Sequence, residues 1–83
     1  VYKMWYASGW GNPDIGYAES VDGKTWVKYL GNPVIVGGCR PHVLKVDGIY
    51  YCYESPLDTG IKRHYSSDGI NWTDEGYVLN VGR

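Results

Sequence analysis

Two cationic side chains near the middle of the chain could bind a ligand. Arg40 and His42 are two residues apart, so in an extended strand their side chains point to the same side. A guanidinium and an imidazole placed together donate hydrogen bonds to sugar hydroxyls or pair with a carboxylate. Arg83 follows Val-Gly much as Arg40 follows Gly-Cys, and it repeats the same cation. The sequence therefore predicts a site for a carbohydrate or a small anion at these residues.

Two further side chains complete the candidate site. Glu54 ends a predicted strand beside a loop, where a carboxylate can orient a hydroxyl or act as an acid. Trp10 lies between two glycines and offers an aromatic platform for the apolar face of a sugar. Of all these residues, only Glu54 is a candidate for catalysis.

Each candidate also has a structural interpretation, which the sequence leaves open. Arg40 could pair with an acid between two sheets, and His42 could be a packed, hydrogen-bonded residue. Glu54 could be solvated or paired with an arginine, and Trp10 could cap a core.

The charge balance favours a neutral or small ligand. Eight basic residues stand against nine acidic ones, for a net charge of −1, whereas nucleic acids and anionic membranes call for a basic patch. No apolar run approaches the roughly 20 residues of a membrane span. We therefore expect no nucleic-acid or membrane partner, and no ligand spacing indicates a metal or another cofactor. The compartment cannot be inferred.

A repeat with an offset of 44 to 47 residues organises the chain. Residues 2–8 are similar to residues 49–55, residues 15–26 are similar to residues 61–72, and Val34-Ile35 is similar to Val78-Leu79. A period of this length, built from short strands and turn signals, is typical of a β-propeller with four strands per blade. Nine Tyr, four Trp and twelve Gly agree with short strands and tight turns.

The turn signals place the strands. Asp47-Gly48 is the strongest two-residue hairpin signal, and it joins a predicted strand at 40–46 to a returning strand at 49–55. We expect an all-β chain of about seven strands in two four-stranded antiparallel repeats. Residues 1–39 form the first repeat, which lacks its inner strand. Residues 40–83 form the second, which ends where a third inner strand would begin.

The same hairpin predicts that the cysteines are free thiols. It pairs Cys52 with Val43 and leaves Cys39 four residues out of register. At roughly 3.3 Å per residue, that separation exceeds the reach of a disulfide.

A second turn motif occurs twice, as Ser-x-Asp-Gly-x-x-Trp at 20–26 and at 66–72. The Ser and Asp side chains hydrogen-bond to the local backbone, the Gly takes a positive φ, and the Trp packs behind the turn. We expect structural roles for Asp22, Asp68, Trp26 and Trp72.

These motifs resemble the blades of the clan of five-bladed β-propeller glycosidases that includes glycoside hydrolase families 43, 32 and 117, together with uncharacterised relatives. The resemblance covers nearly the whole chain, and it rests on the two Ser-x-Asp-Gly-x-x-Trp turns and on residues 2–6, 15–20 and 40–51. For an active glycosidase of this clan, the resemblance implies a catalytic Asp at the start of an inner strand and a Glu from another blade as general acid. Arg40 stands in place of that Asp, and a cation cannot be a nucleophile. No catalytic set of carboxylates can be assigned within the chain.

Three functions follow as hypotheses. The sequence favours a propeller segment that binds carbohydrate and is not catalytic by itself. The alternatives are part of an active glycoside hydrolase whose catalytic acids lie in other blades, and a purely structural oligomeric scaffold. Because open sheet edges and uncovered blade faces are liabilities, we expect other blades, or copies of the chain itself, as partners.

Overall fold

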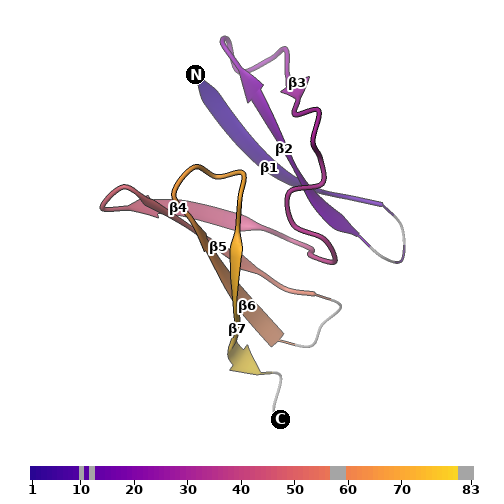
Figure 1. Ribbon diagram of the computed structural model, residues 1–83. Helices are drawn as coiled ribbons and strands as arrows, with labels where there is room; N and C mark the ends of the chain where they lie inside the picture. Colours follow the sequence, from indigo (N-terminus) through magenta and orange to yellow (C-terminus); the bar gives the residue numbers. More distant parts are fainter. Residues whose placement is uncertain (10, 12, 57–59, 81–83) are drawn as a thin grey trace.

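A computed structural model describes residues 1–9, 11, 13–56 and 60–80 (Figure 1). Within these residues the chain forms seven strands, no helix, and therefore no helix that could cross a membrane. A three-stranded antiparallel sheet contains β1 (Tyr2–Ser8), β2 (Asp14–Ser20) and β3 (Val27–Lys28) in that order. A four-stranded antiparallel sheet follows, ordered β4 (His42–Val46), β5 (Ile49–Glu54), β6 (Gly60–Ser66) and β7 (Thr73–Asn80). The all-β prediction is confirmed.

The β4–β5 hairpin forms where the sequence predicts it. Asp47 and Gly48 both have a positive φ, at 52° and 83°, which is the backbone of a type I′ turn. The pairing places Val43 opposite Cys52, and both cysteines are free, as expected.

The two Ser-x-Asp-Gly turns share a set of hydrogen bonds between side chain and backbone. In the second turn, Ser66 Oγ accepts from Gly69 N at 2.8 Å, while Asp68 Oδ1 accepts from the backbone N–H groups of Ile70 and Asn71 at 2.8 and 2.9 Å. The first turn repeats each bond at the matching position and the same distance. Donation from the backbone to Asp68 holds the pKa of its carboxyl well below its usual range. The structural role predicted for both aspartates is confirmed.

The strand register corrects one part of the sequence comparison. β1 pairs Tyr2 with Ser20, whereas β5 pairs Tyr50 with Ser66. Since Ser20 and Ser66 begin the same turn, Tyr2 corresponds to Tyr50 and not to Ile49. A shift of one residue moves every side chain of a strand to the other face. The counterpart of Glu54 in the first sheet is therefore Tyr6, and that of Tyr53 is Trp5.

Each sheet has two faces that can be named from this register. The serine face carries Ser20 in the first sheet and Ser66 in the second, and the reverse face lies opposite. Trp5 is on the reverse face of the first sheet. Its ring centroid lies 5.5 Å from that of Tyr50, on the serine face of the second sheet, and 6.2 Å from that of Trp72. The sheets therefore stack with unlike faces together.

The core between the sheets is small and is closed by the linker that joins them. Ile15, Ile35 and Cys52 form this core, and the side chains packed around them are Val34, Val43, Trp5 and Trp72. Asn32 attaches the linker to β2, because its Oδ1 accepts from Tyr17 N at 2.8 Å and its Nδ2 donates to Tyr17 O at 3.0 Å. Ile35 then bridges to Ile15. Figure 1 shows the linker running beside β2 on its way to β4.

The core position of Cys52 predicts a difference in thiol reactivity. Cys52 is fully buried, and burial raises the pKa of its thiol to about 12, whereas Cys39 is partly exposed. Because the thiolate is the reactive form, iodoacetamide should modify Cys39 in the folded protein and Cys52 only after unfolding. Mass spectrometry of the protein and of a Cys39→Ser control, with and without denaturant, checks this. Rapid modification of Cys52 in the native Cys39→Ser variant would contradict it.

Candidate functional site

Arg40 is exposed and lies just before β4, with a φ of 53°. The strand expected from residue 40 begins at His42 instead, because this left-handed backbone conformation breaks the extended chain. For a residue with a Cβ, this region of φ and ψ is sterically unfavourable by about 1–2 kcal/mol. The positive φ of Asp47 belongs to a hairpin turn, whereas Arg40 has a positive φ outside the hairpin turns.

The backbone just before Arg40 is fixed from two directions. Ser55 N donates to Cys39 O at 2.8 Å, and Cys39 N donates to Glu54 Oε1 at 3.3 Å. Gly38 allows this approach, since a Cβ there would lie 3.3 Å from the Glu54 carboxyl carbon and 2.7 Å from Ile15 Cδ1. The end of β5 thus positions the residue that precedes Arg40.

His42 is the first residue of β4, and its side chain is exposed. It pairs with Tyr53, so it lies on the reverse face of the second sheet. Glu54 is the next residue along β5 and lies on the serine face. The structure therefore places His42 and Glu54 on opposite sides of the sheet. The predicted alignment of Arg40 with His42 assumed a continuous strand, which the structure does not have.

Glu54 is 2% exposed and pairs with His64, which is 5% exposed. His64 Nε2 lies 2.9 Å from Glu54 Oε2, while the other carboxylate oxygen accepts from the Cys39 backbone. Among the described residues, the carboxylate therefore pairs with His64 and not with an arginine, and it is shielded from solvent. In this arrangement it has no access to a ligand, and it acts as a positioning group for the segment before Arg40.

Sequence reasoning missed His64. The sequence comparison aligns it with Ala18, which has no comparable chemistry. Alternation along β6 puts His64 on the same side as Ser66, and the register places it opposite Cys52. The position of His64 on the same face as Ser66 could have been inferred from the Ser-x-Asp-Gly turn. Its pairing with Glu54 could not, because the sequence does not define the register between β5 and β6.

Cys52, His64 and Glu54 do not form a nucleophilic triad, although they are neighbours on one face. A cysteine nucleophile needs a lowered pKa and access to substrate. Cys52 is fully buried, and its pKa is raised. These residues support the junction of the two sheets.

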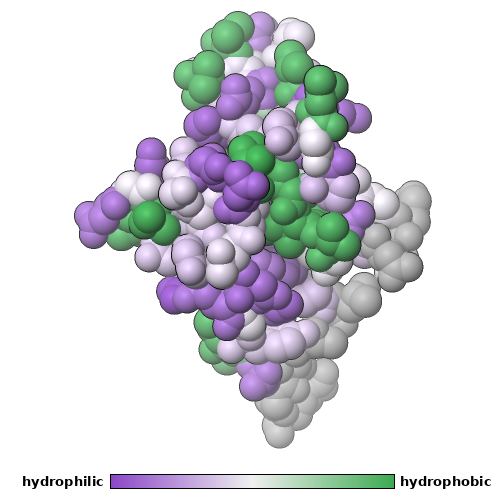
Figure 2. All heavy atoms as spheres, viewed as in Figure 1, coloured by the Kyte–Doolittle hydropathy of each residue, from purple (hydrophilic) through white to green (hydrophobic). Residues whose placement is uncertain are grey.

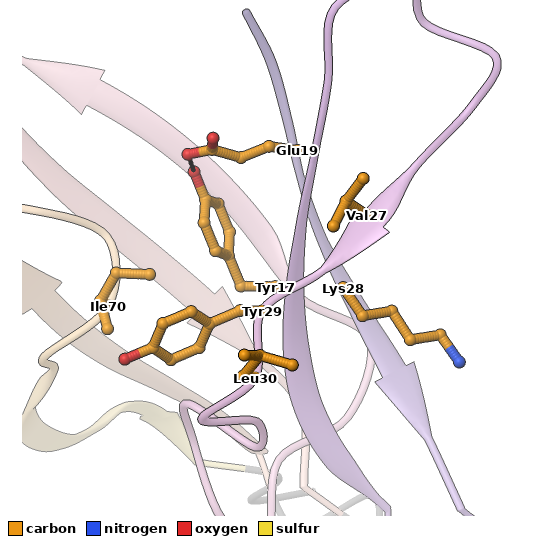
Figure 3. A pocket seen from close by; sticks show the side chains of 7 residues that line it. All are labelled: Tyr17, Glu19, Val27, Lys28, Tyr29, Leu30 and Ile70. Atoms are coloured by element: carbon orange, nitrogen blue, oxygen red, sulfur yellow. Dashed lines mark hydrogen bonds between the residues drawn. The ribbon is translucent and has the colours of Figure 1, made fainter.

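A cleft of about 430 Å³ opens at that junction (Figure 3). Figure 3 shows the Tyr29 ring directed towards Ile70, with Tyr17 and Glu19 above it in the view. Tyr17 donates from its hydroxyl to Glu19, and Lys3 Nζ donates to the Tyr17 hydroxyl at 2.9 Å. The hydrogen bond from Tyr17 lowers the pKa of Glu19, while burial raises the pKa of Tyr17. The Tyr17 hydroxyl and the Glu19 carboxylate are thus already paired with each other and with Lys3.

Trp10 and Arg83, the remaining candidates, lie outside the described residues. Among the residues that are described, no group of three or more His, Cys, Asp or Glu side chains could hold a metal ion. No protein-family model, curated protein or solved structure matches the chain.

Proposed function

We propose that the chain forms two successive blades of a glycosidase-type β-propeller, which bind a carbohydrate or a small anion at Arg40 and do not hydrolyse it. The blade interpretation is supported by the duplicated turns and by the stacking of unlike faces. In such a ring, the first strand of a complete blade lies at the central channel. β4 is that strand in the four-stranded sheet, so Arg40 would face the channel.

The observation that carries the ligand proposal is the conformation of Arg40. An exposed arginine is held at a φ of 53° by a backbone fixed at Cys39, where glycine would be the unstrained choice. Strained residues persist where the surrounding structure enforces them, and they concentrate at ligand sites. The guanidinium supplies a planar set of donors that suits carboxylates, phosphates and vicinal hydroxyls.

The absence of catalysis follows from the carboxylates. Glycoside hydrolysis in this type of enzyme needs two carboxyl groups beside the scissile bond. Arg40 replaces one of them, and Glu54 is buried against His64. We expect no turnover of an aryl glycoside by the pure chain. Turnover that is abolished by Glu54→Gln, in a variant that still folds, would overturn this part of the proposal.

The ligand part is tested with Arg40→Gly. Glycine takes a positive φ without strain, and relief of that strain offsets the loss of side-chain contacts, so the free energy of unfolding should stay within about 1 kcal/mol of wild type. Loss of hydrogen bonds from a charged donor should weaken binding about tenfold or more. Affinity is measured by calorimetry with glycan-array hits, phosphate and citrate as probes. Arg40→Lys is the matched control, since it keeps the charge and loses the planar donor set.

Two results would count against the ligand proposal. Blank glycan and anion titrations of the wild-type protein would leave the scaffold function. A loss of stability in Arg40→Gly, with unchanged affinity, would assign Arg40 to the fold.

A further inference from the structure

The packing between the two sheets defines a pair of complementary faces. The first sheet contributes its reverse face, with Trp5, and the second contributes its serine face, with Tyr50 and the turn at Gly69. Trp5 Nε1 donates to Gly69 O at 2.9 Å, and a Cβ on Gly69 would lie 2.8 Å from the Trp5 ring. Because the two faces differ, the contact is heterologous, and within the part of the chain that the structure describes no other sheet covers the remaining face of each kind.

The uncovered reverse face of the second sheet is aromatic. Alternation and register place Tyr51, Tyr53 and Tyr65 on it, and Tyr65 is 41% exposed. Arg63 Cζ lies 5.0 Å from the centroid of the Tyr51 ring, and Arg63 Nε donates to Glu75 at 2.6 Å. Tyr53 occupies the position that Trp5 has in the first sheet. The Tyr53 hydroxyl hydrogen-bonds to Arg63, so this face has a phenol where the internal interface has an indole.

The uncovered serine face of the first sheet is the matching acceptor surface. Tyr2, Met4 and Tyr6 lie on it, at the positions of Tyr50, Cys52 and Glu54 in the internal interface. The turn beside it carries Gly23 and Trp26, the counterparts of Gly69 and Trp72.

Exposed aliphatic side chains lie at the edge of the first sheet, beside the turn at Gly23. Val1, Val21 and Val27 are 81%, 86% and 70% exposed, and together with Glu19, Ser20 and Thr25 they line a hollow of about 280 Å³. Val27 pairs with Glu19 and so lies on the reverse face, which places this hollow at the edge of the sheet and not on the serine face. Figure 2 shows hydrophobic groups at the top of the view, where the first sheet lies.

We propose that a second copy of this chain covers the serine face of the first sheet with the reverse face of its own second sheet. Tyr53 of that copy then contacts Gly23 and Trp26 as Trp5 contacts Gly69 and Trp72. One chain supplies both members of the complementary pair, which is the observation that selects a copy of the chain as the occupant. A heterologous contact repeated from copy to copy forms a closed ring when the rotation between successive copies adds up to a full turn. The proposal rests on the blade interpretation above, and it is independent of a ligand at Arg40.

The test separates the two faces by mutation. Tyr53→Asp places a charge on the reverse face, and Met4→Asp places one on the serine face. Wild-type protein should sediment as an oligomer, and each variant alone should be a monomer. An equimolar mixture should form a 1:1 heterodimer, because each variant retains the face that the other lacks. Native mass spectrometry identifies the two chains, and Val36→Asp, outside both faces and 80% exposed in the wild type, is the matched control.

A second pair of variants at more exposed positions guards against failed folding. Tyr65→Asp and Tyr2→Asp replace side chains that are 41% and 57% exposed, and circular dichroism checks that they fold. A monomeric wild-type protein would overturn the assembly, as would a pair of variants that stay monomeric when mixed. Oligomers formed by one variant alone would indicate an isologous contact and would also overturn it. Loss of ligand binding in Arg40→Gly is measured separately, so failure of the assembly is distinguishable from failure of the ligand site.

Discussion

Replacing Trp5 with alanine should destabilise the protein more than any other single change between the sheets. The ring of Trp5 lies 5.1 Å from that of Tyr17, 5.5 Å from that of Tyr50 and 6.2 Å from that of Trp72, measured between centroids. Its indole N–H also donates across the junction to Gly69 O. Loss of a large packed aromatic costs about 3–5 kcal/mol, and we expect about 3 because Trp5 is only partly buried. Urea unfolding followed by circular dichroism measures the change.

Two controls separate packing from hydrogen bonding at Trp5. Trp5→Phe keeps an aromatic ring but removes the donor, so it should cost about 1 kcal/mol. In the monomeric Met4→Asp background, Trp26→Ala removes the matching tryptophan beside the face that a second copy would cover, and it should cost less than Trp72→Ala, which opens the internal interface. If the free energy of unfolding of Trp5→Ala lies within about 0.5 kcal/mol of the wild-type value, the junction is not what stabilises the pair of sheets.

Replacing Glu54 with alanine should have the second large effect. The substitution leaves His64 and the Cys39 backbone N–H buried without their acceptor. A buried polar group left without its hydrogen-bond partner typically costs about 1–3 kcal/mol, and this substitution leaves two such groups. We expect a loss near 3 kcal/mol, together with weaker ligand binding, because the segment before Arg40 is no longer fixed.

Glu54→Gln is the matched control for this prediction. The amide oxygen can still accept from Cys39 N, so the variant should lose less stability than Glu54→Ala. The double variant with His64→Ala completes a cycle, in which a coupling energy of about 1 kcal/mol or more indicates direct interaction. Additive losses would mean that Glu54 and His64 act independently.

Local turn chemistry made most of the fold predictable. Asp47-Gly48 and the two Ser-x-Asp-Gly turns fix hairpins through short-range hydrogen bonds and positive φ angles, which depend on a few neighbouring residues. The number of strands and the pairing of Cys52 with Val43 followed from those turns.

Features that depend on longer loops were not predictable. The register between β1 and β2 is set across the loop at 9–13, so similarity of residue types aligned Tyr2 with Ile49, one position away from its structural counterpart. The pairing of Glu54 with His64 depends on the register across the loop at 55–59 in the same way. Both side chains lie between the sheets, where burial depends on tertiary packing.

The candidate site was predictable only in part. Arg40 is exposed and lies just before the first strand of the four-stranded sheet, whereas the sequence predicts it as the first residue of that strand. Its left-handed φ could not be anticipated, because arginine has no preference for that conformation and the constraint comes from Ser55 and Glu54. The same change of direction at residue 40 removes His42 from the predicted alignment.

A crystal structure of the assembled protein tests the proposed propeller most directly. We predict that every contact between neighbouring sheets, within one chain or between copies, joins a reverse face to a serine face. Tyr53 should then lie at Gly23 and Trp26 of the next copy, with the Arg40 guanidinium at the central channel. Contacts between two like faces, or an Arg40 that points away from the channel, would contradict the proposal.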